Sequence, residues 1–366
     1  MMLSERYIFR PLVVFWGNAR NRKINILIIG NGFDLDHGLD TRYSALQKIL
    51  KRRDISKYEM ATDFFLCGNE ALWSKVEQHL GDYNFDDFRN AADENIQEVS
   101  NMGAYDYSSN SGDLAISVDN AEYELKKYSS SDEVLQNIVD LEQVEELFCF
   151  VIRGLSEMVD LVDQKLSNVP PIYPNLVSLH DSFLNFNYTH TLETVYGVLP
   201  EHVFHIHGVT DESIIFGTDK IDELENITES NVEDYYDDNS NSEPDIDSSF
   251  YGEAKPSAFQ GCITTANEYA CQFNKIMKDT LTKEMQHQQL KDWCNNQKNV
   301  HKITITGHAF GTVDLPYFQE LIQMLNPDEI EISYFNEDDK KRIEKFFNNQ
   351  YVGTNIIIKS LQMLKS

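Results

Sequence analysis

The sequence predicts an α/β protein built on a doubly wound, mainly parallel sheet. Short apolar runs rich in β-branched residues alternate with longer segments of helical periodicity, which is the order expected of a parallel sheet. Residues 26–29 form one such run without the alternation of a half-exposed strand, which is typical of a strand buried on both faces. This run leads into Gly30-Asn31-Gly32 and then into a helical segment.

The remaining elements follow in order along the chain. A helix at residues 44–51 and a second at 71–80 come after the glycine turn, and apolar residues then recur at helical spacing over 132–167 until Pro170-Pro171 ends the pattern. We expect further strands at residues 182–186, 202–206, 213–216, 302–306, 329–335 and 355–359. We expect further helices at residues 269–296, 314–324 and 337–347.

Composition divides the chain into one principal domain with additions. Residues 1–23 form a basic N-terminal extension, and residues 24–366 form the α/β domain. Within that domain we place a largely helical insertion at 52–175, with a low-complexity tract at 105–113, and an acidic loop at 219–255. Residues 219–247 alone contain twelve carboxylates and one lysine. We interpret this stretch as a solvated loop, because it lacks the ligand spacing of a calcium-binding loop.

Charge and cysteine content limit the class of protein. The formal net charge of −29 argues against general nucleic-acid binding, which depends on basic side chains that neutralise phosphates. No apolar run approaches the roughly 20 residues that cross a bilayer, so we expect no membrane span. The five cysteines contain no CxxC pair and no disulfide-like spacing, which favours reduced thiols and a cytoplasmic location.

Polar residues follow four of the expected strands at the point where each strand ends. The carboxyl ends of parallel strands meet at one edge of the sheet, where ligands bind in Rossmann-like folds. The segments concerned are Gly30 to Asp34, Asn187 to His190, His207-Gly208, and Gly307-His308 with Asp314 shortly after. A hydrophobic core needs none of these groups, so the sequence predicts a polar cleft there.

The same segments resemble a known family. The blocks GNGFDLDHGL, NFNYTHTLE, HIHG and GHAFGTVDLPYF are similar, in this order, to those of the AbiH family of bacterial phage abortive-infection proteins. They extend from Gly30 to Phe318, with one departure at Asp40, where the pattern leads us to expect proline. The resemblance implies a role in phage defence and a phage-derived trigger.

A more distant resemblance implies a chemistry. The order of blocks is similar to that of sirtuin-like NAD-consuming defence domains, which implies a sirtuin-like sheet with NAD as substrate and no metal. Matched by motif, Gly30 and Gly32 cradle the NAD phosphates, Asn187 positions the nicotinamide ribose and a water, and His207 is the general base. Thr189 stands where that pattern has an aspartate. With neighbouring positions, the expected NAD-binding residues are Gly30, Asn31, Gly32, Phe33, Asp34, Tyr188, His190, Gly208, Gly307, His308 and Asp314.

The predicted reaction is hydrolysis of NAD to nicotinamide and ADP-ribose. Breaking the nicotinamide–ribose bond passes through an oxocarbenium-like state, so the site needs a positioned water and a base. Asn187 supplies an amide that can place the water. Histidine suits proton transfer at neutral pH, because its ordinary pKa is about 6.5.

Two other functions stay open at this stage. His37, His190, His205, His207, His308, Asp34 and Asp314 could supply ligands for a metal-dependent hydrolase, although no HExxH spacing supports it. A module that senses a nucleotide or binds a phage protein without catalysis is the second alternative. We assign His205 a supporting role, and we take Trp73, Glu77 and Lys278 as packing or surface residues. The oligomeric state stays open, a homo-oligomer included.

Overall fold

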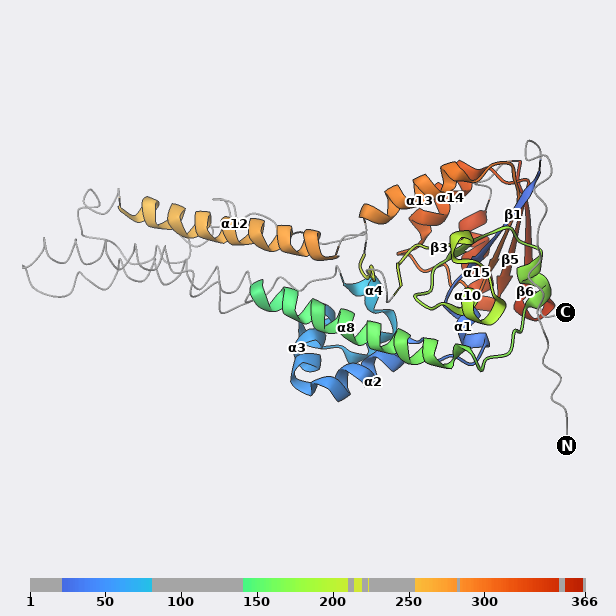
Figure 1. Ribbon diagram of the computed structural model, residues 1–366. Helices are drawn as coiled ribbons and strands as arrows, with labels where there is room; N and C mark the ends of the chain where they lie inside the picture. Colours follow the sequence, from blue (N-terminus) through green and yellow to red (C-terminus); the bar gives the residue numbers. More distant parts are fainter. Residues whose placement is uncertain are drawn as a thin grey trace, which may run out of the picture.

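The computed structural model describes residues 22–80, 141–209, 214–218, 223, 254–281, 284–348 and 353–364. Its centre is a six-stranded sheet with the order β3-β2-β1-β4-β5-β6. Figure 1 shows this sheet with helices packed around it. Every strand pair is parallel. The strands are β1 (Ile24–Ile29), β2 (Ser182–Asn185), β3 (Val203–His205), β4 (Val300–Thr306), β5 (Glu329–Tyr334) and β6 (Asn355–Ser360). The parallel Rossmann-like sheet that the sequence predicts is confirmed.

Strand β1 lies at the middle of the sheet and is buried on both faces. It pairs with β2 on one side and β4 on the other, so that Ile28 lies between Leu184 and Ile305. Residues 26–29 are fully buried. Ile26 and Ile28 face one core and Leu27 and Ile29 the other, which explains why the sequence shows a continuous apolar run here.

Helices cover both faces of the sheet, as in a doubly wound fold. On the Ile28 face the packed helices are α13 (Glu284–Asn296), α14 (Leu315–Leu325) and α15 (Glu337–Phe347). On the Leu27 face they are α1 (Asn31–Asp36), α9 (Pro174–Ser178), α10 (Thr191–Tyr196) and the short η4 (Leu361–Leu364). A 3-10 turn, η3 (Pro200–His202), precedes β3.

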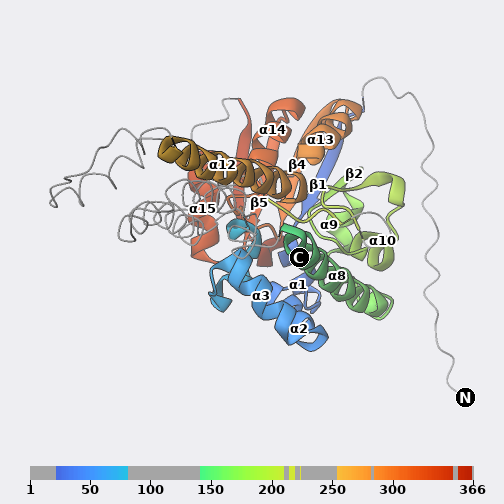
Figure 2. The same ribbon diagram turned by 90° about the vertical axis from the view of Figure 1, so that its left-hand side faces the viewer.

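A second hydrophobic core lies beside the carboxyl edge of the sheet and is built mainly from helices. It joins α2 (Tyr43–Arg53), α3 (Ile55–Leu66), η1 (Glu70–Lys75), α4 (Val76–His79), α8 (Leu141–Leu166) and the inner half of α12 (Ala254–Leu281). Figures 1 and 2 show α2, α3 and α8 packed side by side, while α12 extends away from the sheet. Trp73 belongs to this core and donates its indole N–H to Thr62 at 2.9 Å, and Lys278 is exposed.

One expected strand is absent. Residues 214–217 have no regular structure, and Thr218 forms an isolated bridge, so the prediction of a strand at 213–216 is wrong for the part that the structure describes. The reason lies in the backbone partners. Ile215 donates to the carbonyl of His207 at 2.9 Å and Thr218 donates to Leu281 at 2.9 Å, so the segment bonds to a loop and to a helix end.

The helical expectations differ from the structure mainly at their ends. The pattern at 269–296 comprises two helices, α12 and α13, and the helix expected at 337–347 has those bounds. Residues 1–21, the tract at 105–113 and most of the acidic loop lie outside the described residues. Within the described residues, we find no helix with the length and hydropathy that a membrane crossing requires.

Candidate functional site

A cavity of about 490 Å³ lies at the carboxyl edge of the sheet, between the sheet and the helical core. Its floor is formed by the loops that follow β1, β2, β3 and β4, and its far wall by α4 and α8. In this strand order the connections leave the sheet in opposite directions at β1 and β4, and such a switch point opens a ligand crevice. The cavity is therefore where the fold itself predicts a ligand.

The glycine turn after β1 is locked against the loop after β4. Gly30 donates its N–H to Thr306 at 3.1 Å, Gly32 donates to Gly307 at 2.7 Å, and Phe33 donates to Gly30 at 2.8 Å. A Cβ on Gly32 would lie 2.8 Å from the carbonyl oxygen of Gly307, and one on Gly30 would lie 2.8 Å from Cα of His308. These glycines permit close packing of two loops. This differs from our expectation that their N–H groups receive a phosphate.

Asp34 is a completely buried carboxyl group at the cavity wall. It accepts hydrogen bonds from the hydroxyls of Thr189 at 2.6 Å and Thr191 at 2.8 Å. Burial raises the pKa of Asp34 to about 6, although the hydrogen bonds from both threonines oppose this rise. Thr189 therefore positions the carboxyl group of Asp34 through this hydrogen bond.

Asn187 is a buried residue that lines the cavity. Its side-chain amide donates to the carbonyl of Gly30 at 3.1 Å, and its backbone N–H donates to Oδ1 of Asn185 at 2.8 Å. Nδ1 of His205 lies 3.2 Å from the carbonyl oxygen of Asn187, and Nε2 of His205 lies 2.8 Å from Oε1 of Glu193. The position of Asn187 is thus fixed from three sides.

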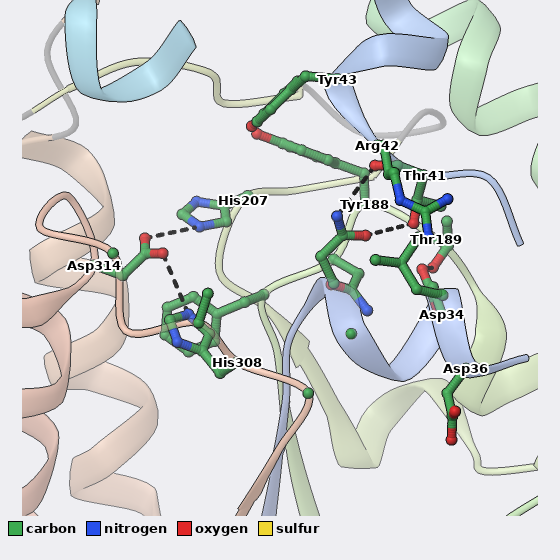
Figure 3. Close-up of a pocket in the computed structure, with 18 of the residues that line it drawn as sticks. Asp34, Asp36, Thr41, Arg42, Tyr43, Tyr188, Thr189, His207, His308 and Asp314 are labelled. Carbon is green, nitrogen blue, oxygen red and sulfur yellow. Dashed lines mark hydrogen bonds and ion pairs between the residues drawn. The ribbon is translucent and has the colours of Figure 1, made fainter. Parts of the chain in front are cut away.

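Asp314 lies between two histidines (Figure 3). Its Oδ2 is 3.2 Å from Nε2 of His308, and its Oδ1 is 3.6 Å from Nε2 of His207. Nδ1 of His308 accepts the N–H of Phe310 at 3.0 Å, which places the ring proton on Nε2. His207 is 4% exposed, and its Nδ1 is buried without a hydrogen-bond partner. A histidine that lines a cavity beside a carboxylate, with its other nitrogen unpaired, can act as a general base.

Two tyrosines close the side of the cavity nearest the helical core. The hydroxyls of Tyr43 and Tyr188 approach each other in Figure 3, and Tyr188 donates to Glu77 of α4 at 3.2 Å. Burial and the Glu77 carboxylate raise the pKa of both phenols well above the ordinary value. Glu77, taken from the sequence as a packing or surface residue, lines the cavity.

The described residues around the cavity are strongly acidic. They include one arginine, Arg42, and five carboxyl groups, those of Asp34, Asp36, Glu77, Asp314 and Asp339. Carboxylates favour a ligand with a positively charged portion. Arg42 is the cation available to a negatively charged portion of the ligand.

Nine of the thirteen predicted site residues line the cavity, namely Asn31, Gly32, Asp34, Asn187, Tyr188, His207, Gly307, His308 and Asp314. The other four do not. Gly30 lies beneath His308, and Phe33 is 1% exposed and stacked on Tyr173 at 5.4 Å. His190 is paired with Asp163 at 2.7 Å, and Gly208 turns the chain with φ of 68°.

Sequence reasoning missed Tyr43, Glu77, Arg42 and Phe335 as lining residues. The first three belong to α2, α4 and the turn before α2, within or next to the helical insertion. Phe335 is the last residue of the strand expected at 329–335. That position was the one available signal, because it is a strand end at the carboxyl edge.

The structure also bears on the metal alternative. Among the residues whose placement is described, no three His, Cys, Asp or Glu side chains are arranged to hold a metal ion. His37 illustrates the reason, since its ring nitrogens contact the carbonyl of Phe33 at 2.7 Å and the hydroxyl of Tyr196 at 2.6 Å. Of the seven candidate ligands, His207, His308 and Asp314 lie together, whereas His37 belongs to a separate hydrogen-bonding network.

Fold and cavity together define a Rossmann-like α/β protein with a ligand pocket at the switch point of its sheet. The family model described as "Bacteriophage abortive infection AbiH" matches residues 26–336. The chain therefore belongs to the AbiH family, and this membership supports a role in phage abortive infection. Searches of curated proteins and of solved structures gave no match. The similarity to sirtuin-like domains is not confirmed by these comparisons.

Proposed function

We propose that this AbiH protein hydrolyses NAD to nicotinamide and ADP-ribose during phage infection. The observation that carries the proposal is the state of His207 in the cavity. Nε2 of its ring lies 3.6 Å from Oδ1 of Asp314, farther than a hydrogen bond, while Nδ1 is buried and unpaired. Catalytic contacts are often long in unliganded sites and shorten when substrate binds.

In this proposal Nδ1 of His207 accepts the proton of the attacking water. Water adds to C1 of the nicotinamide ribose as the bond to the pyridinium nitrogen breaks, and that nitrogen keeps the bonding electron pair, so nicotinamide leaves neutral. Asn187 lies on the same floor, fixed by Gly30 and Asn185, and orients the ribose and the water. General base catalysis typically contributes about 10²- to 10⁴-fold in rate.

The charge of the cavity supports the same reaction. Positive charge moves from the pyridinium ring to the ribose as the bond breaks, and the surrounding carboxylates stabilise it in both positions. Arg42, at the cavity wall, is available to the pyrophosphate. An acidic site of this kind favours the oxidised, cationic form of the cofactor as substrate.

The biological consequence follows from the family. An enzyme that exhausts NAD on infection halts the host before the phage multiplies, which is the outcome that abortive infection describes. Such an enzyme must be inactive before infection, so the proposal includes a phage-derived trigger.

The test is incubation of purified protein with NAD, with and without phage lysate, followed by chromatography of nicotinamide and ADP-ribose. With phage lysate, wild type should release both products, and His207→Ala and Asn187→Ala should each lose at least 10²-fold in turnover. The matched control is His301→Ala, which removes an exposed histidine paired with Asp328 at 2.7 Å, at the other end of β4. Binding of NAD without product under every condition would overturn hydrolysis and favour a nucleotide sensor.

A further inference from the structure

The cavity is longer than the reaction centre requires. It extends from His207, after β3, to Ser333 and Phe335, at the end of β5. Four strand spacings separate β3 from β5 in the sheet, and at about 4.8 Å each they amount to about 19 Å. A nicotinamide ribose occupies only the His207 end. The remainder has room for a second ring joined by a linker.

The far end of the cavity presents an aromatic ring. Phe335 is 79% exposed, more than any other large hydrophobic side chain among the described residues. A single exposed apolar residue is ordinary on a protein surface. Phe335 differs because it also lines the cavity and lies at the carboxyl end of a strand in a Rossmann-like sheet.

The backbone around Phe335 is fixed on both sides. Strand β5 ends at Tyr334, and Asn336 caps α15 by accepting the N–H of Asp339 at 2.8 Å. Arg342 of α15 contacts Asp339 and donates from Nε to the carbonyl of Ala309 at 3.0 Å. Since Ala309 follows Gly307 and His308, this arginine joins the Phe335 end of the cavity to the loop that carries His308 and Asp314.

We infer that Phe335 is the stacking platform for the purine base of the bound dinucleotide. This inference rests on the proposed function in that it takes the ligand to be NAD, and it assigns the adenosine half to the β5 end. An exposed, pre-positioned ring stacks on a base with little ordering cost, because its backbone is already held. Stacking of one base on an aromatic side chain corresponds to roughly 5- to 150-fold in affinity.

The experiment is calorimetric titration of the full-length protein with ADP-ribose and, separately, with nicotinamide mononucleotide, which lacks the purine. Phe335→Ala should weaken ADP-ribose binding roughly 5- to 150-fold and leave mononucleotide binding within twofold of wild type. Phe335→Trp should bind ADP-ribose at least as tightly as wild type. The matched control is Leu179→Ala, which truncates a side chain that is 66% exposed just before β2, at the other edge of the sheet, and should change nothing.

The outcomes separate this inference from the proposed function. If ADP-ribose binds equally well to wild type and to Phe335→Ala, the stacking platform is wrong, whether or not NAD is hydrolysed. If Phe335→Ala lowers affinity for ADP-ribose but wild type releases no nicotinamide, base stacking on Phe335 is supported and NAD hydrolysis is contradicted. If wild type binds neither ADP-ribose nor NAD, both fail.

Discussion

The backbone N–H of Gly32 donates to the carbonyl of Gly307 at 2.7 Å, so the loops that follow β1 and β4 are joined at their tips. Gly307 has φ of 69°, and a Cβ there would lie 2.2 Å from the backbone nitrogen of Phe33. The contact holds the two central strands of the switch point at a fixed separation. It also sets the floor of the cavity, because Gly32 and Gly307 both line it.

Gly307→Ala should therefore lower the free energy of unfolding by about 2–5 kcal/mol, since left-handed backbone strain and a backbone clash add. Gly197→Ala is the matched control, because Gly197 has the same φ of 69° with nothing within 4 Å of its Cβ position. We expect about 1–2 kcal/mol there, from strain alone. Urea unfolding measures both, and equal losses would contradict the packing role of Gly307.

Asp314→Asn should lower kcat for NAD about 10²-fold with little change in KM. The amide keeps the shape of the side chain but removes the charge that holds His207 and accepts from His308. Asp328→Asn removes the carboxylate of another histidine–aspartate pair, 2.7 Å from His301 and remote from the cavity, and should leave kcat unchanged. Steady-state kinetics at pH 7 distinguish the two, and full activity of Asp314→Asn would remove Asp314 from the mechanism.

Asp34 should make stability depend on pH. Its pKa of about 6 in the folded protein lies above the ordinary 3.8 because burial disfavours the charged form. The protonated form therefore stabilises the fold, a contribution fully present below about pH 4 and lost as the pH rises through 6. Two pKa units correspond to about 3 kcal/mol.

Asp34→Asn stays neutral throughout this range. Its free energy of unfolding, relative to wild type, should rise by about 3 kcal/mol between pH 4 and pH 7. Urea unfolding of both proteins at each pH measures the change. A difference that stays constant with pH would show that the Asp34 carboxyl group ionises in the fold as it does in the unfolded chain.

His205→Ala should destabilise the protein by about 3 kcal/mol at pH 7. The substitution removes the partner of Oε1 of Glu193, whose Oε2 is already buried without a hydrogen bond, and so leaves a buried carboxylate unpaired. Adding Glu193→Gln removes the charge and should recover part of the loss. Thermal unfolding of the single and double variants tests this coupling. A double variant less stable than His205→Ala would contradict it.

The sheet could be predicted because its pattern is local. Ile26 to Ile29 show burial on both faces, and the polar residues after each strand meet at one edge because parallel strands require it. The cavity floor, with Asn187, His207 and Asp314, followed from that rule. The strand expected near Ile215 failed because its backbone bonds to His207, a partner that local propensity does not reveal.

The walls of the cavity could not be predicted in the same way. Glu77 and Tyr43 reach it because the helical core places α4 and α2 against the sheet edge, and no periodicity in either helix specifies that docking. The pattern of Gly30 and Gly32 predicted a phosphate-binding turn. In the structure the two glycines permit the close approach of Gly307 and His308. Phosphate binding and close packing of loops require the same glycine pattern, so the sequence does not distinguish them.

The central position of β1 has a consequence for synthesis of the chain. About 150 residues separate its end from its first partner β2, and about 270 separate it from β4. At about 5–20 residues per second, β1 leaves the ribosome roughly 15–55 s before β4 is complete. Throughout that interval an apolar strand has an unpaired edge, so the nascent protein depends on chaperones or on the early helices to keep it from aggregating.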